Sequence, residues 1–307
     1  MNRETFGDRL TGLVAERSSQ IVLGLDPDPT RLWPRSLSAA EGVGTGPGER
    51  AARAVLAHCR LVIDAAGEHC VAVKPQVACF ERLGAPGWAA LREVVSAAQE
   101  RGLLVIADAK RGDIDISARA YGQAFFAGTE TPFGAVPGLG ADAMTVNPLL
   151  GADSLAPLVQ EARALMGGLF VLVRTSNPGA ADVQDQSLAA GGAVSDALAG
   201  LVATLGAPGI GPGGIADIGA VVGATAPERL RALRQAMPNA PFLLPGVGAQ
   251  GGRVEDLAPA FAPGPAGGLI SASRSIVNAH EKIGGDPEGA AAREAARLRE
   301  LAWGIAT

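Results

Sequence analysis

Residues 103–117 join a buried apolar segment to a cluster of charges whose spacing suits proton transfer. The apolar run from Leu103 to Ala107 predicts a buried strand, and Asp108 and Lys110 follow it directly. Because side chains on a strand alternate between its faces, the carboxylate of Asp108 and the ammonium of Lys110 are expected on one face. Two charges alone are equally well explained as an ion pair that closes the strand. A third charge, Asp113, favours chemistry, because isolated buried charges are costly.

Other expected strands also end at polar residues. These residues are Asp26, Lys74, Asn147, Thr175 with Ser176, the segment 246–250, and Ser273 with Arg274. In a parallel barrel the carboxyl ends of all strands meet at one mouth, where the active site lies. Each residue alone is explained as a loop cap, but the set predicts a polar pocket for catalysis.

A glycine-rich segment and an arginine near the carboxyl terminus predict a phosphate site. The segment is Pro245-Gly-Val-Gly-Ala-Gln-Gly-Gly252, and Arg274 follows the next expected strand. Glycines let backbone N–H groups approach an anion closely, and an arginine adds a forked, charge-assisted contact. A glycine-rich turn beside a surface arginine is the alternative. The combination favours a phosphorylated small-molecule substrate.

Strands and helices alternate eight times along the sequence. The expected strands span residues 21–25, 71–76, 103–107, 143–147, 169–173, 218–222, 241–247 and 267–273. The expected helices cover 4–18, 49–69, 86–101, 116–126, 153–166, 187–205 and 227–237, with a helical tail after residue 274. We interpret the chain as α/β, a single (β/α)8 TIM barrel domain over residues 1–307, with loop insertions near 34–48 and 127–140. A doubly wound open sheet is the alternative, but no dinucleotide-binding glycine pattern follows the first strand.

The composition indicates a globular protein with an aliphatic core, since 48% of its 307 residues are hydrophobic and only 4% aromatic. The net charge is −5 and no basic stripe carries interleaved aromatics, which argues against nucleic-acid binding. No apolar run reaches roughly 18 residues and the amino terminus is charged, so neither a membrane span nor a secretory signal is expected. Cys59, Cys70 and Cys79 form no CxxC pair, so we expect reduced thiols and a cytoplasmic protein.

No motif for a cofactor is found in the sequence, which lacks a Walker loop. Carboxylates at the expected mouth could hold Mg²⁺, but Lys74 and Lys110 would repel a cation there. We therefore expect chemistry without a metal or cofactor, in which fixed charges act directly on the substrate.

The segment Asp108-Ala-Lys110-Arg-Gly-Asp113 resembles the D-x-K-x-x-D signature of the orotidine 5'-phosphate decarboxylase family. The resemblance extends over about residues 20–278 and includes Asp26, Lys74, Ser176-Asn-Pro-Gly179, the segment 245–250 and Arg274-Ser-Ile276. The segments Val-Lys-Pro-Gln and Ala-Lys-Arg-Gly-Asp resemble those of the bacterial branch with longer chains, often called type 2. The resemblance implies decarboxylation of orotidine 5'-phosphate to uridine 5'-phosphate, the last step of de novo pyrimidine biosynthesis.

Two other functions stay open beside this one. The signature is shared with Mg²⁺-dependent sugar-phosphate decarboxylases and a hexulose-phosphate synthase, in which a glutamate ligand is expected where this chain has Lys74. A non-catalytic barrel that binds nucleotides as a sensor is the second alternative. The intact set of Asp108, Lys110 and Asp113 argues against it, because binding alone does not need that set.

The resemblance also implies the catalytic roles. Lys110 is expected to protonate C6 of the pyrimidine, Asp108 to face the substrate carboxylate, and Lys74 to link these charges to the ribose. Asp113 is expected to enter the site of a neighbouring subunit, with Ser117 where the family often has threonine. The resemblance thus implies a homodimer with shared active sites.

Substrate-binding roles follow from the same resemblance. Asp26 is expected to accept a ribose hydroxyl, and Ser176 to read the pyrimidine edge. The expected phosphate contacts are Gly248, Gln250 and Arg274. One departure is Ser273, which stands where the family commonly has glycine; a backbone N–H is retained there.

Overall fold

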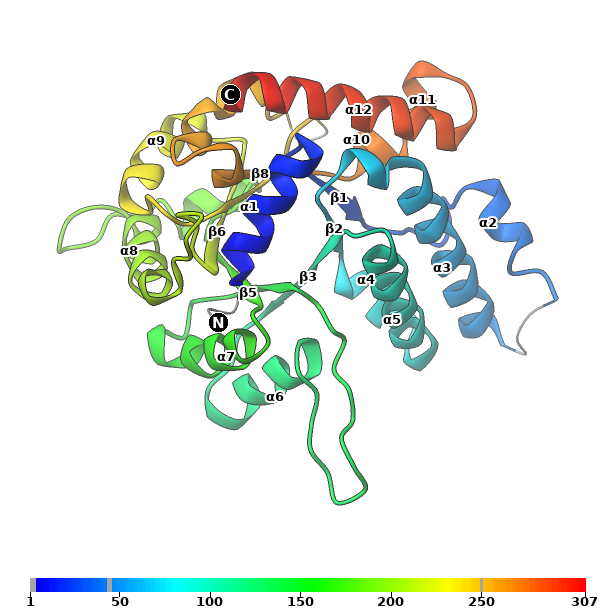
Figure 1. The fold of residues 1–307 in the computed structure, drawn as a ribbon, viewed down its shortest axis with the longest axis horizontal. Helices are drawn as coiled ribbons and strands as arrows, with labels where there is room; N and C mark the ends of the chain where they lie inside the picture. The colour runs from blue at the N-terminus through cyan, green and yellow to red at the C-terminus, as the bar shows by residue number, and fades with distance from the viewer. Residues whose placement is uncertain (1–3, 43–45, 249–250) are drawn as a thin grey trace.

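In the computed structural model, which describes residues 4–42, 46–248 and 251–307, eight parallel strands close into a barrel (Figure 1). They are β1 (Ile21–Leu25), β2 (Ala72–Pro75), β3 (Leu104–Arg111), β4 (Ala143–Val146), β5 (Gly168–Arg174), β6 (Ile218–Val222), β7 (Phe242–Pro245) and β8 (Gly268–Ala272). Neighbours follow sequence order, and β1 pairs with β8 to close the ring. The single (β/α)8 barrel is therefore confirmed.

Helices surround this barrel on its outer face (Figure 1). They are α1 (Phe6–Arg17), α2 (Pro34–Ser38), α3 (Pro47–Ala66), α4 (Val77–Glu81), α5 (Ala85–Glu100), α6 (Asp115–Phe125), α7 (Ala152–Ala164), α8 (Val194–Gly206), α9 (Pro227–Ala236), α10 (Arg274–Val277), α11 (His280–Ile283) and α12 (Pro287–Ala306). Between β7 and β8 the described residues form two 3₁₀ helices, Val254–Phe261, which contains Pro259, and Pro265–Gly267. Proline lacks the N–H that an α-helix interior needs, so an α-helix is not favoured in this connection.

The strands are buried on both faces, as a parallel sheet under helices requires. Every residue of β1, β2, β4, β6 and β8 is buried. Valine, leucine, isoleucine and alanine from the strands and helices form a continuous core between the two layers. A second cluster fills the barrel interior and includes Val22, Ile106 and Phe170.

Helix α1 covers the amino-terminal end of the barrel. Its start is fixed by a capping box in which Thr5 and Asp8 exchange side-chain to backbone hydrogen bonds, each 3.1 Å long. Phe6 packs edge-on against Phe170 of β5, with ring centroids 6.0 Å apart. The polar mouth therefore lies at the opposite end, where the strands finish.

The structure corrects several expected boundaries. Residues 34–48 were expected to be irregular, but α2 lies within them and α3 begins at Pro47, since proline suits the first helical turn. Helix α4 was not expected, and α8 begins at Val194 rather than at residue 187. The left-handed residues Gly191 and Gly192 precede that start and favour a turn.

Residues 127–140 contain no helix or strand, as expected, and form a long loop that projects from the barrel beside α6 (Figure 1). A short antiparallel bridge joins Thr129 to Val136 within it. In the described part of the chain, no helix is long and apolar enough to cross a membrane.

Candidate active site

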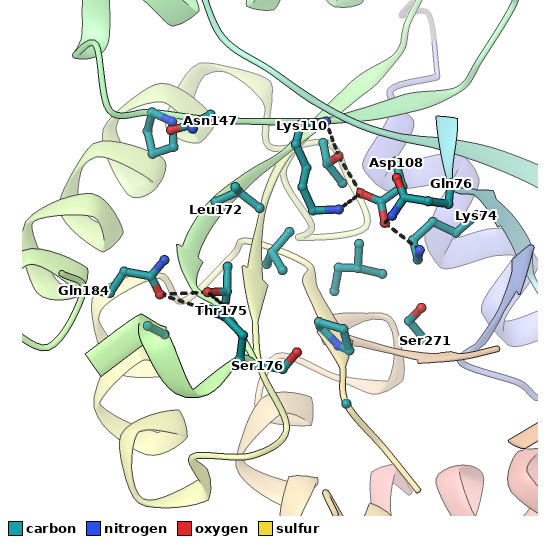
Figure 2. Close-up of a pocket in the computed structure, with 18 of the residues that line it drawn as sticks. Lys74, Gln76, Asp108, Lys110, Asn147, Leu172, Thr175, Ser176, Gln184 and Ser271 are labelled. Carbon is teal, nitrogen blue, oxygen red and sulfur yellow. Dashed lines mark hydrogen bonds and ion pairs between the residues drawn. The ribbon is translucent and has the colours of Figure 1, made fainter. Parts of the chain in front are cut away.

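A cavity of about 870 Å³ opens at the carboxyl ends of the strands. Its apolar wall is formed by Leu172, Val194, Leu198, Leu201, Val221 and Leu243. One side carries Lys74, Asp108 and Lys110, and the other carries Thr175, Ser176 and Gln184 (Figure 2). This volume and this mixture of apolar wall and few polar groups are typical of small-molecule sites.

Asp108 is the centre of the charged side. Its Oδ2 accepts the Lys74 ammonium at 2.6 Å, and its Oδ1 accepts the Lys110 ammonium at 2.5 Å (Figure 2). Gln76 Nε2 donates to Oδ2 at 3.3 Å, and the Thr145 hydroxyl donates to Oδ1 at 2.9 Å. Four donors therefore fix one buried carboxylate.

These contacts decide the charge state of the array. Burial alone raises the pKa of Asp108, but Lys74 and Lys110 outweigh it and hold that pKa well below its usual range. Burial likewise lowers the pKa of Lys74, yet the attraction of Asp108 and Asp26 raises it above the ordinary value. At neutral pH Asp108 is thus an anion and Lys74 a cation.

The two ammonium groups differ in their access to the cavity. The side chains of Lys74 and Asp108 are each 8% exposed, whereas that of Lys110 is 45% exposed. Lys74 therefore belongs to the floor, and Lys110 extends into the space that a ligand would fill. A charged donor beside a fixed anion in this position can give a proton to a bound molecule.

Several residues expected to bind substrate also line the cavity. Asp26 follows β1, Ser176 follows β5, and Arg274 begins α10. Gly248 does not line the cavity; it is exposed in a turn with a φ of +73°, and a Cβ placed there would lie 3.6 Å from the Cβ of Ser275. Gln250 lies outside the described residues.

Ser273 is accommodated by the strand beside it. A Cβ added to Gly24 of β1 would lie only 2.6 Å from the Cβ of Ser273. The missing side chain of Gly24 therefore leaves the space that Ser273 fills. Ser273 and Arg274 both line the cavity, so the departure from glycine does not move this strand end away from the site.

Asp113 and Ser117 are not brought to this cavity within the chain. Asp113 lies between β3 and α6, where its Oδ1 accepts the N–H of Ile114 at 2.8 Å. Ser117 is exposed on the first turn of α6. The structure thus assembles Lys74, Asp108 and Lys110 but leaves these two residues outside the lining.

The polar lining residues that the sequence reasoning missed include Gln76, Thr145, Gln184 and Ser271. Thr145 could have been found, because it lies two residues before Asn147 and shares its strand face. Gln184 accepts the N–H of Thr175 through its Oε1 at 2.7 Å, across a loop that no local pattern reveals.

The cavity offers few ligands for a metal. Among the described residues its carboxylates are Asp26 and Asp108, and both lysines already bind Asp108. No group of three His, Cys, Asp or Glu side chains suited to a metal occurs in residues 4–42, 46–248 and 251–307.

Comparisons with known proteins point to one family. The family model described as Orotidine 5'-phosphate decarboxylase / HUMPS family matches residues 19–290. An orotidine 5'-phosphate decarboxylase of Deinococcus radiodurans is 42% identical over 298 residues, which cover 96% of each chain. One from Rhodopirellula baltica is 40% identical over 281 residues, covering 91% of this chain and 90% of that protein. The solved structure of Leishmania donovani OMP decarboxylase is 31% identical with a TM-score of 0.70, covering 97% of this chain and 98% of that one.

Proposed function

This chain belongs to the orotidine 5'-phosphate decarboxylase / HUMPS family, and we propose that it converts orotidine 5'-phosphate to uridine 5'-phosphate and CO₂. This carboxy-lyase reaction is the last step of de novo pyrimidine biosynthesis. The observation that supports it most is the array in which the buried carboxylate of Asp108 binds both the buried Lys74 and the half-exposed Lys110. Placement in the bacterial type 2 branch stays a prediction.

The chemical problem is a carbanion that the substrate cannot delocalise. Loss of CO₂ leaves an electron pair on C6 in the plane of the pyrimidine, outside its π system. Enzymes commonly lower barriers by about 8–23 kcal/mol, and electrostatic preorganisation is usually the largest part. Lys110, charged and half-exposed to the cavity, would stabilise the electron pair and then donate its proton to C6.

Asp108 and Lys74 would keep that proton donor in place. Asp108 is held as an anion by its two lysines, so it orients the Lys110 ammonium without neutralising it by proton transfer. The same negative charge, facing the substrate carboxylate, would disfavour the bound ground state and be relieved as CO₂ departs. Lys74 would extend the array toward the ribose, beside the ribose contact proposed for Asp26.

The phosphate end would supply the binding energy. Arg274 lines the cavity at the start of α10, and we propose that it grips the phosphate together with backbone N–H groups near Gly248 and with Gln250. Ser176, across the cavity, would read the pyrimidine edge. Binding energy gained far from C6 can be used to hold the base against the charged floor.

The direct test is turnover of orotidine 5'-phosphate. Purified protein should remove the orotidine absorbance and release CO₂ and uridine 5'-phosphate in equal amounts. A folded protein that binds the nucleotide but never turns it over would contradict the proposal and favour a non-catalytic sensor.

A second measurement, turnover in the presence of EDTA, distinguishes this function from that of a metal-dependent relative. Lys74 occupies the strand end where Mg²⁺-dependent relatives are expected to have a glutamate, and it already binds Asp108 at 2.6 Å. We therefore expect activity to persist after dialysis against EDTA. Loss of this turnover on chelation, with recovery on adding Mg²⁺, would contradict metal-free chemistry. Mg²⁺-dependent activity on a sugar phosphate, without turnover of orotidine 5'-phosphate, would favour a sugar-phosphate enzyme of the same family.

We further propose a homodimer in which Asp113 and Ser117 complete the site of the other subunit. Both lie outside the cavity of their own chain, and Ser117 is exposed. Exposed apolar side chains flank them, since Ile114 is 51% and Ile116 is 85% exposed. A two-fold interface would cover these side chains and bring Asp113 to a second cavity.

We also propose that the enzyme works in the cytoplasm, where its substrate would be made. Cys59 and Cys70 are buried free thiols, and burial raises the pKa of Cys70 to about 12. Thiols of this kind suit a reducing compartment. Cell fractionation that finds the protein outside the cytoplasm would contradict this assignment.

A further inference from the structure

Strands β3 and β4 lose their common register beside the proton donor. Ala107 pairs with Met144, but the next pair joins Arg111 to Val146. Three residues of β3, 108 to 110, therefore lie opposite a single residue of β4, Thr145. A bulge of this kind re-aims side chains and leaves backbone groups without their usual ladder partners.

The backbone of Lys110 is in the left-handed region, with a φ of +49°. Lysine rarely adopts this conformation, which persists only where the surroundings fix it. The Lys110 N–H donates to the hydroxyl of Thr145 at 3.0 Å instead of to a strand carbonyl. The Thr145 hydroxyl thus provides a hydrogen-bond acceptor for the Lys110 N–H, which has lost its place in the strand ladder.

The same hydroxyl also reaches the charged array. Thr145 Oγ1 donates to Asp108 Oδ1 at 2.9 Å, and that oxygen accepts the Lys110 ammonium. A ring of contacts therefore runs from the Lys110 backbone through Thr145 and Asp108 to the Lys110 side chain. Thr145 is 1% exposed, so water does not replace its hydroxyl easily.

We propose that Thr145 is a positioning residue for the decarboxylation, because its hydroxyl fixes the Lys110 ammonium relative to Asp108 and the cavity. The inference rests on the proposed function of this site. Without the hydroxyl, the Lys110 N–H loses its partner and the left-handed conformation of Lys110 loses its support. A small displacement of a catalytic group strongly lowers the rate while leaving remote substrate contacts in place.

The test compares Thr145→Val, which removes the hydroxyl at constant shape, with Thr145→Ser, which retains it. In the valine variant we expect kcat to fall by roughly 10- to 100-fold, while KM and the Kd of uridine 5'-phosphate change by less than about threefold. The serine variant should recover most of kcat. Thr11→Val is the matched control, since its hydroxyl donates to Gly7 in α1 at 2.8 Å and lies outside the cavity lining.

Each outcome has a defined meaning. Wild-type kcat in folded Thr145→Val, or equal losses in the valine and serine variants, would overturn the inference. A rise in KM with kcat unchanged would also overturn it, since it would assign Thr145 to substrate binding. If the valine variant does not fold, Thr145→Ala is measured in its place. A wild-type protein that fails to decarboxylate the nucleotide would instead contradict the proposed function.

Discussion

The floor and the rim of the cavity are built in different ways. On the floor, Lys74 and Asp108 are each 8% exposed, and Asp108 accepts contacts from four donors. At the rim, which here includes residues just outside the cavity lining, Asp26 and Gly248 are exposed, and Asp113 accepts the N–H of Ile114. The floor is therefore preorganised within one chain, whereas the rim has groups free to meet a ligand or a second subunit.

This difference separates two kinds of contribution to catalysis. Charges fixed before the substrate arrives cost no reorganisation at the moment of reaction, which is why they act mainly on kcat. Exposed groups gain their partners only on binding, so they act mainly on affinity. Substitutions at the floor and at the rim should consequently change different kinetic constants.

The largest effect is expected for Lys110→Ala, which removes the proton donor from the floor. We predict a loss in kcat of roughly 10⁴-fold, with nucleotide binding retained because the phosphate contacts are intact. Steady-state rates and calorimetric binding of uridine 5'-phosphate measure the two quantities. Lys282→Ala, which changes an exposed lysine of α11, should behave as wild type. Substantial turnover by folded Lys110→Ala protein would remove Lys110 from the mechanism.

The next effect tests whether the rim belongs to two subunits. Asp113 is an exception among the rim residues, because in a dimer its carboxylate would join the fixed charges of the other subunit's site. Asp113→Ala should therefore lower kcat by roughly 10²-fold, while Asp115→Ala, a nearby exposed carboxylate on α6, should have little effect. Mixing the Asp113→Ala and Lys110→Ala proteins should restore activity, because each heterodimer would contain one intact site. Demonstrated subunit exchange without recovery would show that each chain completes its own site.

Arg274→Ala should give a smaller effect, and on a different constant. We predict a rise in KM of roughly 10- to 100-fold, because a charge-assisted contact with the phosphate is lost. The affinity for uridine, which has no phosphate, should stay unchanged, whereas that for uridine 5'-phosphate should fall. Arg253→Ala provides a matched control, since Arg253 is exposed and paired at 3.7 Å with Glu255. A loss confined to kcat would assign Arg274 to the floor instead.

The smallest expected effect is the pH dependence of the stability that Asp108 contributes. The pKa of Asp108 is depressed in the folded state, mainly by Lys74 and Lys110 acting against burial, so its contribution to stability is complete above the ordinary value of 3.8. That contribution is lost as the pH falls through the depressed folded pKa. The difference in unfolding free energy between wild type and Asp108→Asn should hence be constant above about pH 5 and shrink in stronger acid. A difference that varies between about pH 6 and pH 8 would show that Asp108 titrates there.

The barrel could be predicted from the sequence because its strands are apolar runs that end at charged residues or proline. The expected strands 21–25 and 218–222 match β1 and β6 residue for residue. Helix α2 was missed because it depends on distant contacts. The N–H of Trp33 donates to His58 Nδ1 at 3.2 Å, and burial lowers the pKa of His58 to about 4, so the imidazole is a neutral acceptor.

Alternation along one strand predicted Asp108 and Lys110 on the same face, and the structure joins them at 2.5 Å, but through a bulge in which the backbone of Lys110 is left-handed. The strand itself continues to Arg111, beyond the expected end at Ala107. The role of Thr145 was beyond the sequence, because a bulge is a property of two paired strands, and residues 107–111 alone do not reveal which β4 residue lies opposite. Contacts across loops, such as that between Thr175 and Gln184, could not be predicted either, because they too depend on how separate segments are placed.

The close approach of Gly24 and Ser273 limits which substitutions this barrel can accept during evolution. A Cβ at residue 24 would lie 2.6 Å from that of Ser273, so a larger residue at 24 and the serine at 273 exclude one another. Even with glycine at 273, a Cβ at residue 24 would lie 3.2 Å from the Cα of residue 273, so the space between the two positions favours a side chain at 273 over one at 24. Residues 24 and 273 therefore share one space, and the side chain present at one position limits which residues the other can accept.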